Sequence, residues 1–396
     1  MTIKQQLMDK LATRNDEMIA IRRHLHENPE LSFEEQQTAQ YIADFYENKD
    51  VTIHGNVGNG YGIIVEIQGR HPGPIIGIRA DFDALPIEEE TDVPFKSKNP
   101  GVMHACGHDG HTAYLLILAD CLIQLKDELH GTVKIIHQHA EEKPPGGAKS
   151  MMASGLLDDC EIIVGAHLFP TFKVGHIGYR AGAAMAGRSF FKLFVHGTGG
   201  HGSSPHLAND AIVAASNFVT TVQTVISRRL NPYDMGVVTI GSFDGKGTFN
   251  VIKDAVTLEG DVRYMNDAVH TTIEQEIKRL VDGLEVQFGV TCTLTYEKDY
   301  PPLVNDEDLT NFVVKTLEAS EQEEIIAVEE APLFSGSEDF AYYALAKPST
   351  FYYIGCQPTY LDVPFMNHHP KFDIDERALL VAAKAGAEVV AKYCLK

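Results

Sequence analysis

Long hydrophobic runs are absent from the 396-residue sequence, and so is any cluster of basic residues. A membrane-spanning helix needs roughly 20 consecutive apolar residues, and the N-terminal stretch MTIKQQLMDKLATRNDEM lacks the apolar core of a signal peptide. Phosphate binding needs clustered Lys and Arg, whereas the formal net charge here is -22. We therefore expect a soluble protein of the cytoplasm that binds neither a membrane nor nucleic acid.

Paired cysteines are missing as well. The six cysteines lie far apart and form no CxxC pair, whereas a disulfide framework or a structural zinc knot would show closer spacing. Reduced thiols are typical of cytoplasmic proteins. Cys121 lies in the apolar run AYLLILADCLIQL and is expected to be buried, but Cys106 is surrounded by glycine and histidine.

Several enzyme signatures are absent or out of context. The sequence has no GxSxG, and no HxE followed by PCxxC, which argues against a serine hydrolase and a zinc deaminase. Gly197, Gly199 and Gly202 spell GxGxxG, but the strand and helix signals around them do not form a parallel βαβ unit. The sequence therefore predicts no dinucleotide site.

The order of strand and helix signals predicts two domains of the α/β kind. Continuous apolar strands alternating with helices favour a largely parallel sheet covered by helices on both faces. Between residues 186 and 298 the pattern changes to β-α-β-β-α-β, the ferredoxin-like α+β unit. We therefore predict a discontinuous catalytic, metal-binding domain at 1–185 and 299–396, interrupted by an inserted lid and dimerisation domain at 186–298.

A helix is predicted within LSFEEQQTAQYIADF. Ser32 and Glu35 have the spacing of a capping box, in which each side chain bonds a backbone N–H of the first helical turn. An amphipathic run follows them. We therefore expect both side chains to be used at the start of this helix.

Polar residues follow several of the predicted strands. Asp81 and Asp83 follow PIIGIRA, Glu141 and Glu142 follow TVKIIHQHA, and His167 follows EIIVGA. Ligands of open parallel sheets bind beyond the carboxyl ends of the strands. We therefore expect these side chains to meet along one edge of the sheet.

The segment HACGHDGH holds three histidines, one cysteine and one aspartate just before a buried helix. Burying so many polar groups is costly without a function. A thiol, a carboxylate and imidazoles together hold a borderline-soft divalent metal. Cys106 and His108 are the candidate ligands, whereas His104 and His111 are each expected to be exposed or hydrogen-bonded.

Consecutive carboxylates point in different directions, so one of the two glutamates can bind metal while the other serves as general acid/base. We favour Glu142 as the ligand and Glu141 as the acid/base, although the residues alone leave the reverse open. His368 and His369 are adjacent, and one of them is expected to reach the metal. Asp83 is placed to orient a histidine ligand.

Seven segments between about residues 22 and 376 stand out together, namely RRHLHENPELSFEE, GIRADFDALPIEE, HACGHDGHTAYLL, AEEKPPGGA, GAHLFP, GGHGSSPH and NHHPKFDIDE. Together they resemble the dinuclear-metal amidohydrolase and peptidase family, which includes hippurate hydrolases, N-acyl-amino-acid deacylases and plant auxin-conjugate hydrolases. The resemblance implies two divalent metal ions per subunit (Zn, Mn or Co), with Glu141 as catalytic acid/base. It implies as metal ligands Cys106, His108, Glu142, His167 and His368.

The resemblance also assigns roles outside these ligands. Asp81 stands where the wider family often has a histidine, and Asp83 keeps the place of the supporting acid, a combination found in the amidohydrolase branch. His201 in GGHGSSPH matches a lid histidine that reaches an active site, in some relatives that of the partner subunit. Asn250 and Arg263 resemble positions that bind the substrate carboxylate, and the lid implies a homodimer.

The expected activity is hydrolysis of the amide bond of a small molecule, an N-acyl amino acid or small peptide. One alternative is an aminopeptidase or dipeptidase that acts on peptides with a free amine. Another, from a different class, is a non-catalytic ligand-binding relative. The presence of both glutamates and of every ligand type speaks against the last.

Overall fold

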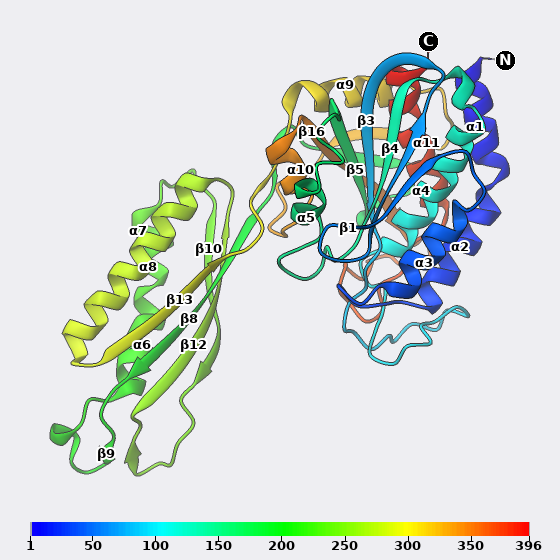
Figure 1. Cartoon of the computed structure of the whole chain (residues 1–396). Helices are drawn as coiled ribbons and strands as arrows, with labels where there is room; N and C mark the ends of the chain where they lie inside the picture. The colour runs from blue at the N-terminus through cyan, green and yellow to red at the C-terminus, as the bar shows by residue number, and fades with distance from the viewer. Residues whose placement is uncertain (1, 396) are drawn as a thin grey trace. The chain divides into compact units, whose positions relative to one another are not determined.

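The computed structural model describes residues 2–395, which form two compact units (Figure 1). The first unit contains the chain up to Ala184, the segment Val304–Pro332 and the chain from Asp339 onward. The second unit contains Met185–Leu303 and Leu333–Glu338. The insertion predicted at 186–298 thus lies inside the second unit, which is slightly longer at both ends and gains one short later segment.

The first unit combines helices with a large sheet. Its helices are α1 (Ile3–Thr13), α2 (Asn15–Glu27), α3 (Gln36–Phe45), α4 (His108–Ile123), the 3-10 helix η1 (Lys126–Glu128), α5 (Ala148–Ala153), α9 (Glu307–Glu318), α10 (Ala341–Ala346) and α11 (Arg377–Cys394). Its sheet strands are β1 (Thr52–Val57), β2 (Gly62–Gln68), β3 (His71–Asp81), β4 (His130–Gln138), β5 (Ile162–Lys173), β6 (His176–Tyr179), β15 (Ala327–Glu330) and β16 (Ser349–Gln357). The short strands β7 (Gly182–Met185) and β14 (Leu303–Asn305) pair with each other.

The large sheet has the strand order β1-β2-β4-β3-β5-β16-β6-β15. Its four central strands, β4, β3, β5 and β16, are parallel, whereas β1 and β2 are antiparallel to their neighbours. Figure 1 shows α4 and α11 on one side of this sheet and α5 and α10 on the other. The predicted α/β class, with a largely parallel sheet covered on both faces, is confirmed.

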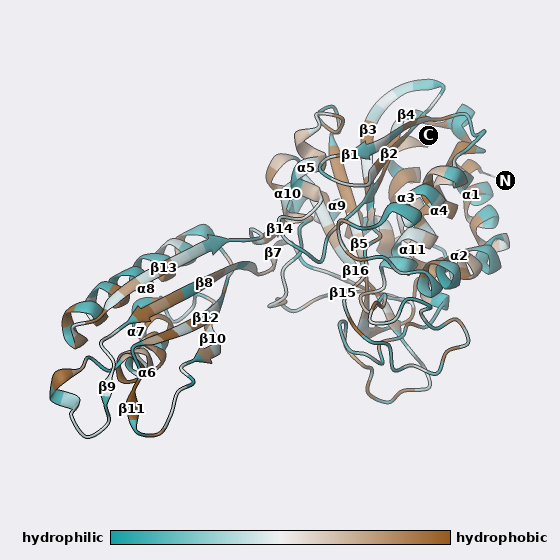
Figure 2. Cartoon of the chain, turned by 60° about the horizontal axis from the view of Figure 1, so that its bottom comes forward, coloured by the Kyte–Doolittle hydropathy of each residue, from teal (hydrophilic) through white to brown (hydrophobic). Residues whose placement is uncertain are grey.

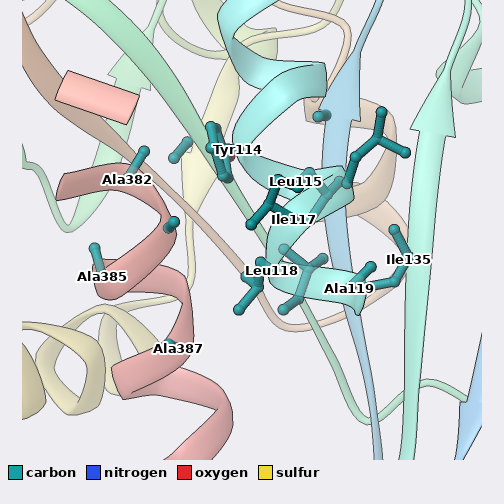
Figure 3. Close-up of a cluster of buried hydrophobic side chains, with 14 of the residues drawn as sticks. Tyr114, Leu115, Ile117, Leu118, Ala119, Ile135, Ala382, Ala385 and Ala387 are labelled. Carbon is teal, nitrogen blue, oxygen red and sulfur yellow. The ribbon is translucent and has the colours of Figure 1, made fainter. Parts of the chain in front are cut away.

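Helix α4 lies at the centre of the hydrophobic core, as Figure 3 shows. Every residue from His108 to Leu122 is buried, so this helix is enclosed on all sides. Small residues on α11 allow close packing: a Cβ added at Gly386 would lie 2.9 Å from Leu118 Cδ2. Because α4 begins at His108, its core packing fixes the ligand-type residues of HACGHDGH at the edge of the sheet.

The second unit has a separate core between one sheet and its helices. Its elements are β8 (Gly187–His196), β9 (Gly200–His201), η2 (Pro205–Leu207), α6 (Ala211–Thr221), α7 (Gln223–Arg229), β10 (Gly236–Asp244), β11 (Val251–Ile252), β12 (Ala255–Tyr264), α8 (Asp267–Phe288) and β13 (Thr291–Lys298). The sheet order β10-β12-β8-β13 is antiparallel throughout, which confirms the ferredoxin-like α+β prediction. Helix α8 is largely hydrophilic on the side seen in Figure 2, because only one of its faces is buried.

The predicted capping box is wrong. Helix α3 begins at Gln36, and Glu35 at its N-cap makes no side-chain capping bond. Glu30 accepts instead, from the backbone N–H of Gln37 at 3.2 Å and of Thr38 at 2.7 Å. A carboxylate from outside the expected motif therefore satisfies the helix start.

Within residues 2–395, no helix is both long and apolar enough to cross a bilayer.

Candidate metal centre

Ligand-type side chains from four places in the sequence meet in the first unit. Donor atoms lie within 4.8 Å of one another in three overlapping sets. These sets are Cys106 with His108 and His167, Cys106 with Glu142 and His368, and His108 with Glu141 and Glu142. The shared members make one continuous cluster of a thiol, imidazoles and carboxylates.

The distances within this cluster are short. Cys106 Sγ lies 3.4 Å from His167 Nε2, and Glu142 Oε1 lies 3.2 Å from His368 Nε2. His108 Nε2 lies 3.9 Å from the same Glu142 oxygen. A divalent cation takes ligands of these types at about 2.0–2.3 Å, so donor atoms spaced in this way can surround one.

Each candidate ligand is held by its local structure. Gly107 has φ 89°, a left-handed conformation that turns the chain from Cys106 into α4. Glu142 follows the end of β4, and His167 lies within β5 rather than beyond it, since this strand continues to Lys173. His368 has φ 70° and donates its backbone N–H to the Ala105 carbonyl at 2.7 Å.

The two adjacent histidines point in different directions. His368 Nε2 faces Glu142. The His369 ring stacks on Phe365 with centroids 4.5 Å apart, and its Nδ1 accepts the backbone N–H of Lys371 at 3.0 Å. The geometry therefore brings His368, and not His369, into the cluster.

Asp83 lies directly behind His108. The His108 Nδ1 is 3.0 Å from the Asp83 carbonyl oxygen and 3.2 Å from its carboxylate Oδ1. The other oxygen, Oδ2, accepts the backbone N–H of Glu142 at 2.9 Å. Bonds of this kind fix the ring orientation of a metal-binding histidine, which is the role expected of Asp83.

Asp81 and His111 form a second hydrogen-bonded pair behind the cluster, and the sequence did not reveal this pair. Arg79 Nη1 donates to Asp81 Oδ2 at 2.7 Å, and His111 Nδ1 donates to Asp81 Oδ1 at 2.6 Å. His111 Nε2 accepts the backbone N–H of Leu168 at 2.8 Å. Both ring nitrogens of His111 are thus engaged, and they connect β3 to the residue after His167.

The electrostatics of the cluster favour a cation. Although burial opposes its protonation, the carboxylates of Asp81 and Asp83 raise the pKa of His108 to about 10. Burial, together with His111, lowers the pKa of His167 and keeps that imidazole neutral. Burial, Glu142 and other carboxylates raise the pKa of the Cys106 thiol, so this thiol needs a cation beside it to ionise.

One buried atom tests whether the residues fit a metal. His108 Nε2 is buried and has no hydrogen-bond partner among residues 2–395, although its other nitrogen is bonded. An unpaired nitrogen in the interior is costly. Because it faces Glu142 and Asp81, a cation at this position would satisfy it, and the donor set fits a borderline-soft divalent ion.

The remaining predicted residues lie in the second unit. His201 is exposed on β9, which pairs with β11 next to Asn250, and the Gly202 N–H donates to the Asn250 carbonyl at 2.8 Å. Arg263 on β12 donates to Asp261 Oδ2 at 2.8 Å. His201 and Asn250 are therefore neighbours on one ladder, and Arg263 is held by its own carboxylate partner.

A thiol, carboxylates and imidazoles gathered at the edge of a parallel α/β sheet define a metal-dependent hydrolase. A sequence profile of Peptidase family M20/M25/M40 matches residues 77–392, and the chain belongs to this family. It is an enzyme that hydrolyses amide bonds.

Three relatives are similar over most of the chain. YhaA of Bacillus subtilis (strain 168), provisionally described as an amidohydrolase, is 45% identical over 98% of this chain and 98% of its own. The N-acetyl-L-cysteine deacetylase of the same organism is 37% identical over 94% of this chain and 87% of its own. The N-acyl-L-amino acid amidohydrolase of Geobacillus stearothermophilus is 38% identical over 77% and 81%.

Two solved structures share the whole fold. One, from methicillin-resistant Staphylococcus aureus and provisionally described as an aminohydrolase, is 55% identical with a TM-score of 0.93, and the match covers 99% of this chain and 100% of the other. The YXEP protein of Bacillus subtilis, a dinuclear metal-binding peptidase of family M20, is 33% identical with a TM-score of 0.82 over 96% and 98%.

Proposed function

We propose that this enzyme cleaves the amide bond of N-acyl amino acids, with two divalent metal ions held in the first unit. The observation that carries the proposal is the set of three overlapping donor groups, which contains more ligand atoms than one ion needs. Two of the relatives are named for N-acyl amino acids, which favours this class of substrate, while two others that are 33% identical are named carboxypeptidases.

Five residues are assigned to the metal ions. When bound, the ions would supply Lewis-acid polarisation of the substrate carbonyl and a lowered pKa for water. Zinc, manganese and cobalt all suit the donor set. The proposed ligands are Cys106, His108, Glu142, His167 and His368.

Glu141 is assigned as general acid/base. It is buried and lies within the donor group that also contains His108 and Glu142. The next residue takes the ligand role, so the two carboxylates serve different atoms of the same site. Glu141 would accept a proton from the attacking water and pass it to the leaving nitrogen. Asp83 would keep His108 oriented throughout.

The second unit is assigned as a lid and dimerisation domain, with the first as catalytic domain. His201 would donate a hydrogen bond to the oxyanion of the tetrahedral intermediate. Asn250 and Arg263 would bind the substrate carboxylate, for which a guanidinium is well shaped. A homodimer located in the cytoplasm is part of the same proposal.

A substrate panel tests the proposed function. Purified enzyme of measured metal content is incubated with N-acetyl amino acids, hippurate and free-amine dipeptides, and release of amino acid is measured. We expect turnover of the N-acylated substrates that a chelator abolishes and that Zn, Mn or Co restores. Faster cleavage of the free-amine dipeptides would instead establish the aminopeptidase or dipeptidase alternative.

A further inference from the structure

Two side chains of the segment before α3 are bonded to the residues around Glu141 and Glu142. Ser32 Oγ donates to Asp83 Oδ2 at 2.6 Å. Glu35 Oε1 accepts the backbone N–H of Ala140 at 2.8 Å. Both side chains are buried, and Glu35 is fully enclosed at 0% exposure.

These side chains are not needed for the helix that follows. Glu30 already accepts the backbone N–H of Gln37 and of Thr38, and the Thr38 hydroxyl as well, at 2.9 Å. Helix α3 is thereby capped without Ser32 or Glu35. The bonds of Ser32 to Asp83 and of Glu35 to Ala140 therefore have to be explained by their effect on the positions of Asp83 and Ala140.

Ala140 has an unusual backbone conformation. Its φ is 51°, in the left-handed region that is strained for a residue other than glycine. Two bonds hold it there: its N–H donates to Glu35, and its carbonyl accepts the Gly147 N–H at 3.0 Å. Two residues later, the Glu142 N–H donates to Asp83. Glu141 thus lies between two peptide groups that are both fixed.

Placing Glu35 at this position is costly for the fold. Its Oε2 is buried without a hydrogen-bond partner among the described residues. Burial and the nearby Asp83 carboxylate raise the pKa of Glu35 to about 8. Burying a carboxyl group beside another carboxylate, with one oxygen unpaired, lowers the stability of the fold. Stability therefore does not explain why glutamate stands at this position.

We propose that Glu35 and Ser32 are positioning residues of the amidohydrolase reaction. Glu35 holds Ala140 in its left-handed conformation, and Ser32 holds the Asp83 carboxylate that accepts the Glu142 N–H. Together they direct Glu141 and Glu142 toward the substrate and the metal. The inference rests on the proposed roles of these two glutamates.

The test is steady-state kinetics of Glu35→Met and Glu35→Gln beside the wild-type enzyme. Methionine keeps the volume and removes the acceptor, so we expect kcat to fall roughly 10- to 100-fold, since small misplacements of catalytic groups have effects of this size. KM and bound metal are expected to stay close to wild type. Glutamine keeps an acceptor oxygen, and we expect it to retain most of the turnover.

A second change tests the backbone argument directly. Glycine adopts a left-handed φ without strain, so Ala140→Gly removes the conformational cost that the Glu35 bond offsets. We expect Ala140→Gly to restore part of the kcat lost in Glu35→Met. A side chain that merely filled space would not be rescued in this way.

The matched control is Glu30→Gln in the same segment. This change weakens the cap of α3, and we expect a lower melting temperature with kcat unchanged. Wild-type kcat in folded Glu35→Met, or an equal loss of kcat in Glu30→Gln, would overturn the proposal. If Glu35→Met does not fold, Ser32→Ala decides: a kcat several-fold lower supports the proposal, and wild-type kcat overturns it.

Glu141→Gln, measured in the same assay, separates this inference from the proposed function. If Glu141→Gln is inactive while Glu35→Met is fully active, only the positioning role fails. If Glu141→Gln is fully active, the acid/base role of Glu141 fails and the positioning role fails with it, whereas the proposed function fails only if the wild-type enzyme does not cleave the N-acylated substrates.

Discussion

The histidines of the cluster are oriented by hydrogen bonds from one ring nitrogen to the protein. His167 Nδ1 donates to the Leu168 carbonyl at 2.9 Å, which directs its Nε2 toward Cys106. His108 is oriented in the same way by Asp83. An imidazole with one nitrogen fixed offers the other in one direction only. The ring orientations of His108 and His167 are therefore set by bonds within the protein.

Replacing Glu141 by glutamine removes a proton acceptor while keeping the shape of the side chain. We expect turnover to fall roughly 10²- to 10⁴-fold, the usual contribution of a general acid/base, with metal content unchanged. Kinetics with an N-acetyl amino acid, together with metal analysis of the same sample, measures both quantities. Glu142→Gln is the matched comparison, because this change should reduce metal content. Full turnover in Glu141→Gln would remove this residue from the proposed mechanism.

At the scale of secondary-structure elements, strand ends were predictable and helix caps were not. Apolar strands followed by polar residues indicated that Asp83, Glu142 and Cys106 would meet, because parallel strands end at a common edge. The capping box failed because α3 begins at Gln36, later than the box requires, and Glu30 accepts the N–H groups of Gln37 and Thr38 in its first turn. Glu30 directly precedes the bridge between Leu31 and Ala84, a tertiary contact that local spacing does not reveal.

The same limit explains what was missed at the site. The bond of Glu35 to Ala140 and that of His111 to Leu168 join segments far apart in the sequence. Residue types alone predicted that His111 would be exposed or hydrogen-bonded, and the second outcome was found. Its partner could not be predicted, because it is a backbone N–H of another strand.

Strand β4 carries a histidine that makes stability depend on pH. His137 is fully buried, and burial lowers its pKa to about 3. In the unfolded chain the group titrates near 6.5. As the pH falls below that value the unfolded state gains a proton and the folded state does not, so stability is lost progressively toward pH 3.

Between pH 6.5 and pH 5 this single group should lower the free energy of unfolding by about 2 kcal/mol. Denaturant titrations of metal-free protein at the two values of pH measure the change. His137→Gln keeps an acceptor for the Tyr46 hydroxyl, which lies 2.9 Å from the ring, and should lose less stability on acidification. An identical pH dependence in the variant would contradict the assignment to His137.

At the scale of the whole molecule, the chain has two cores rather than one. The core of the first unit surrounds α4, and that of the second lies between its sheet and its helices. A chain of this length exceeds one hydrophobic core. The change of pattern at residue 186 predicted an insertion there, because a β-α-β-β-α-β order differs from strand–helix alternation. The later segment Leu333–Glu338 has no such pattern, and its place in the second unit was not predictable.

Because the second unit has a hydrophobic core of its own, we expect residues 185–303 to fold when expressed alone. Circular dichroism on heating should show one cooperative transition, and the fragment should bind none of the transition metals that the full chain binds. The fragment lacks the Phe334 carbonyl that accepts the Ala186 N–H at 3.0 Å, so its ends are expected to fray. A fragment without a cooperative transition would show that this core depends on the rest of the chain.

The proposed role of His201 joins the second unit to catalysis. Its Nδ1 accepts the Ser203 backbone N–H at 3.2 Å and lies 2.7 Å from the Ser203 hydroxyl. Because Nδ1 accepts, the ring hydrogen lies on Nε2, which can donate to an oxyanion. We expect His201→Ala to lower kcat roughly 10²- to 10³-fold with metal content unchanged. The exposed His206 of the same motif is the control, and its replacement by alanine should leave kcat near wild type.

Mixing two inactive variants shows whether His201 acts on its own subunit or on its partner. If it acts on the partner, a heterodimer of Glu141→Gln and His201→Ala has one complete site, because one subunit supplies Glu141 and the other supplies His201. Random exchange of an equal mixture makes half of the dimers heterodimers, so about a quarter of wild-type activity should return. If His201 acts on its own subunit, or if the enzyme is a monomer, the mixture stays inactive. Size-exclusion chromatography of the same mixture separates these two outcomes.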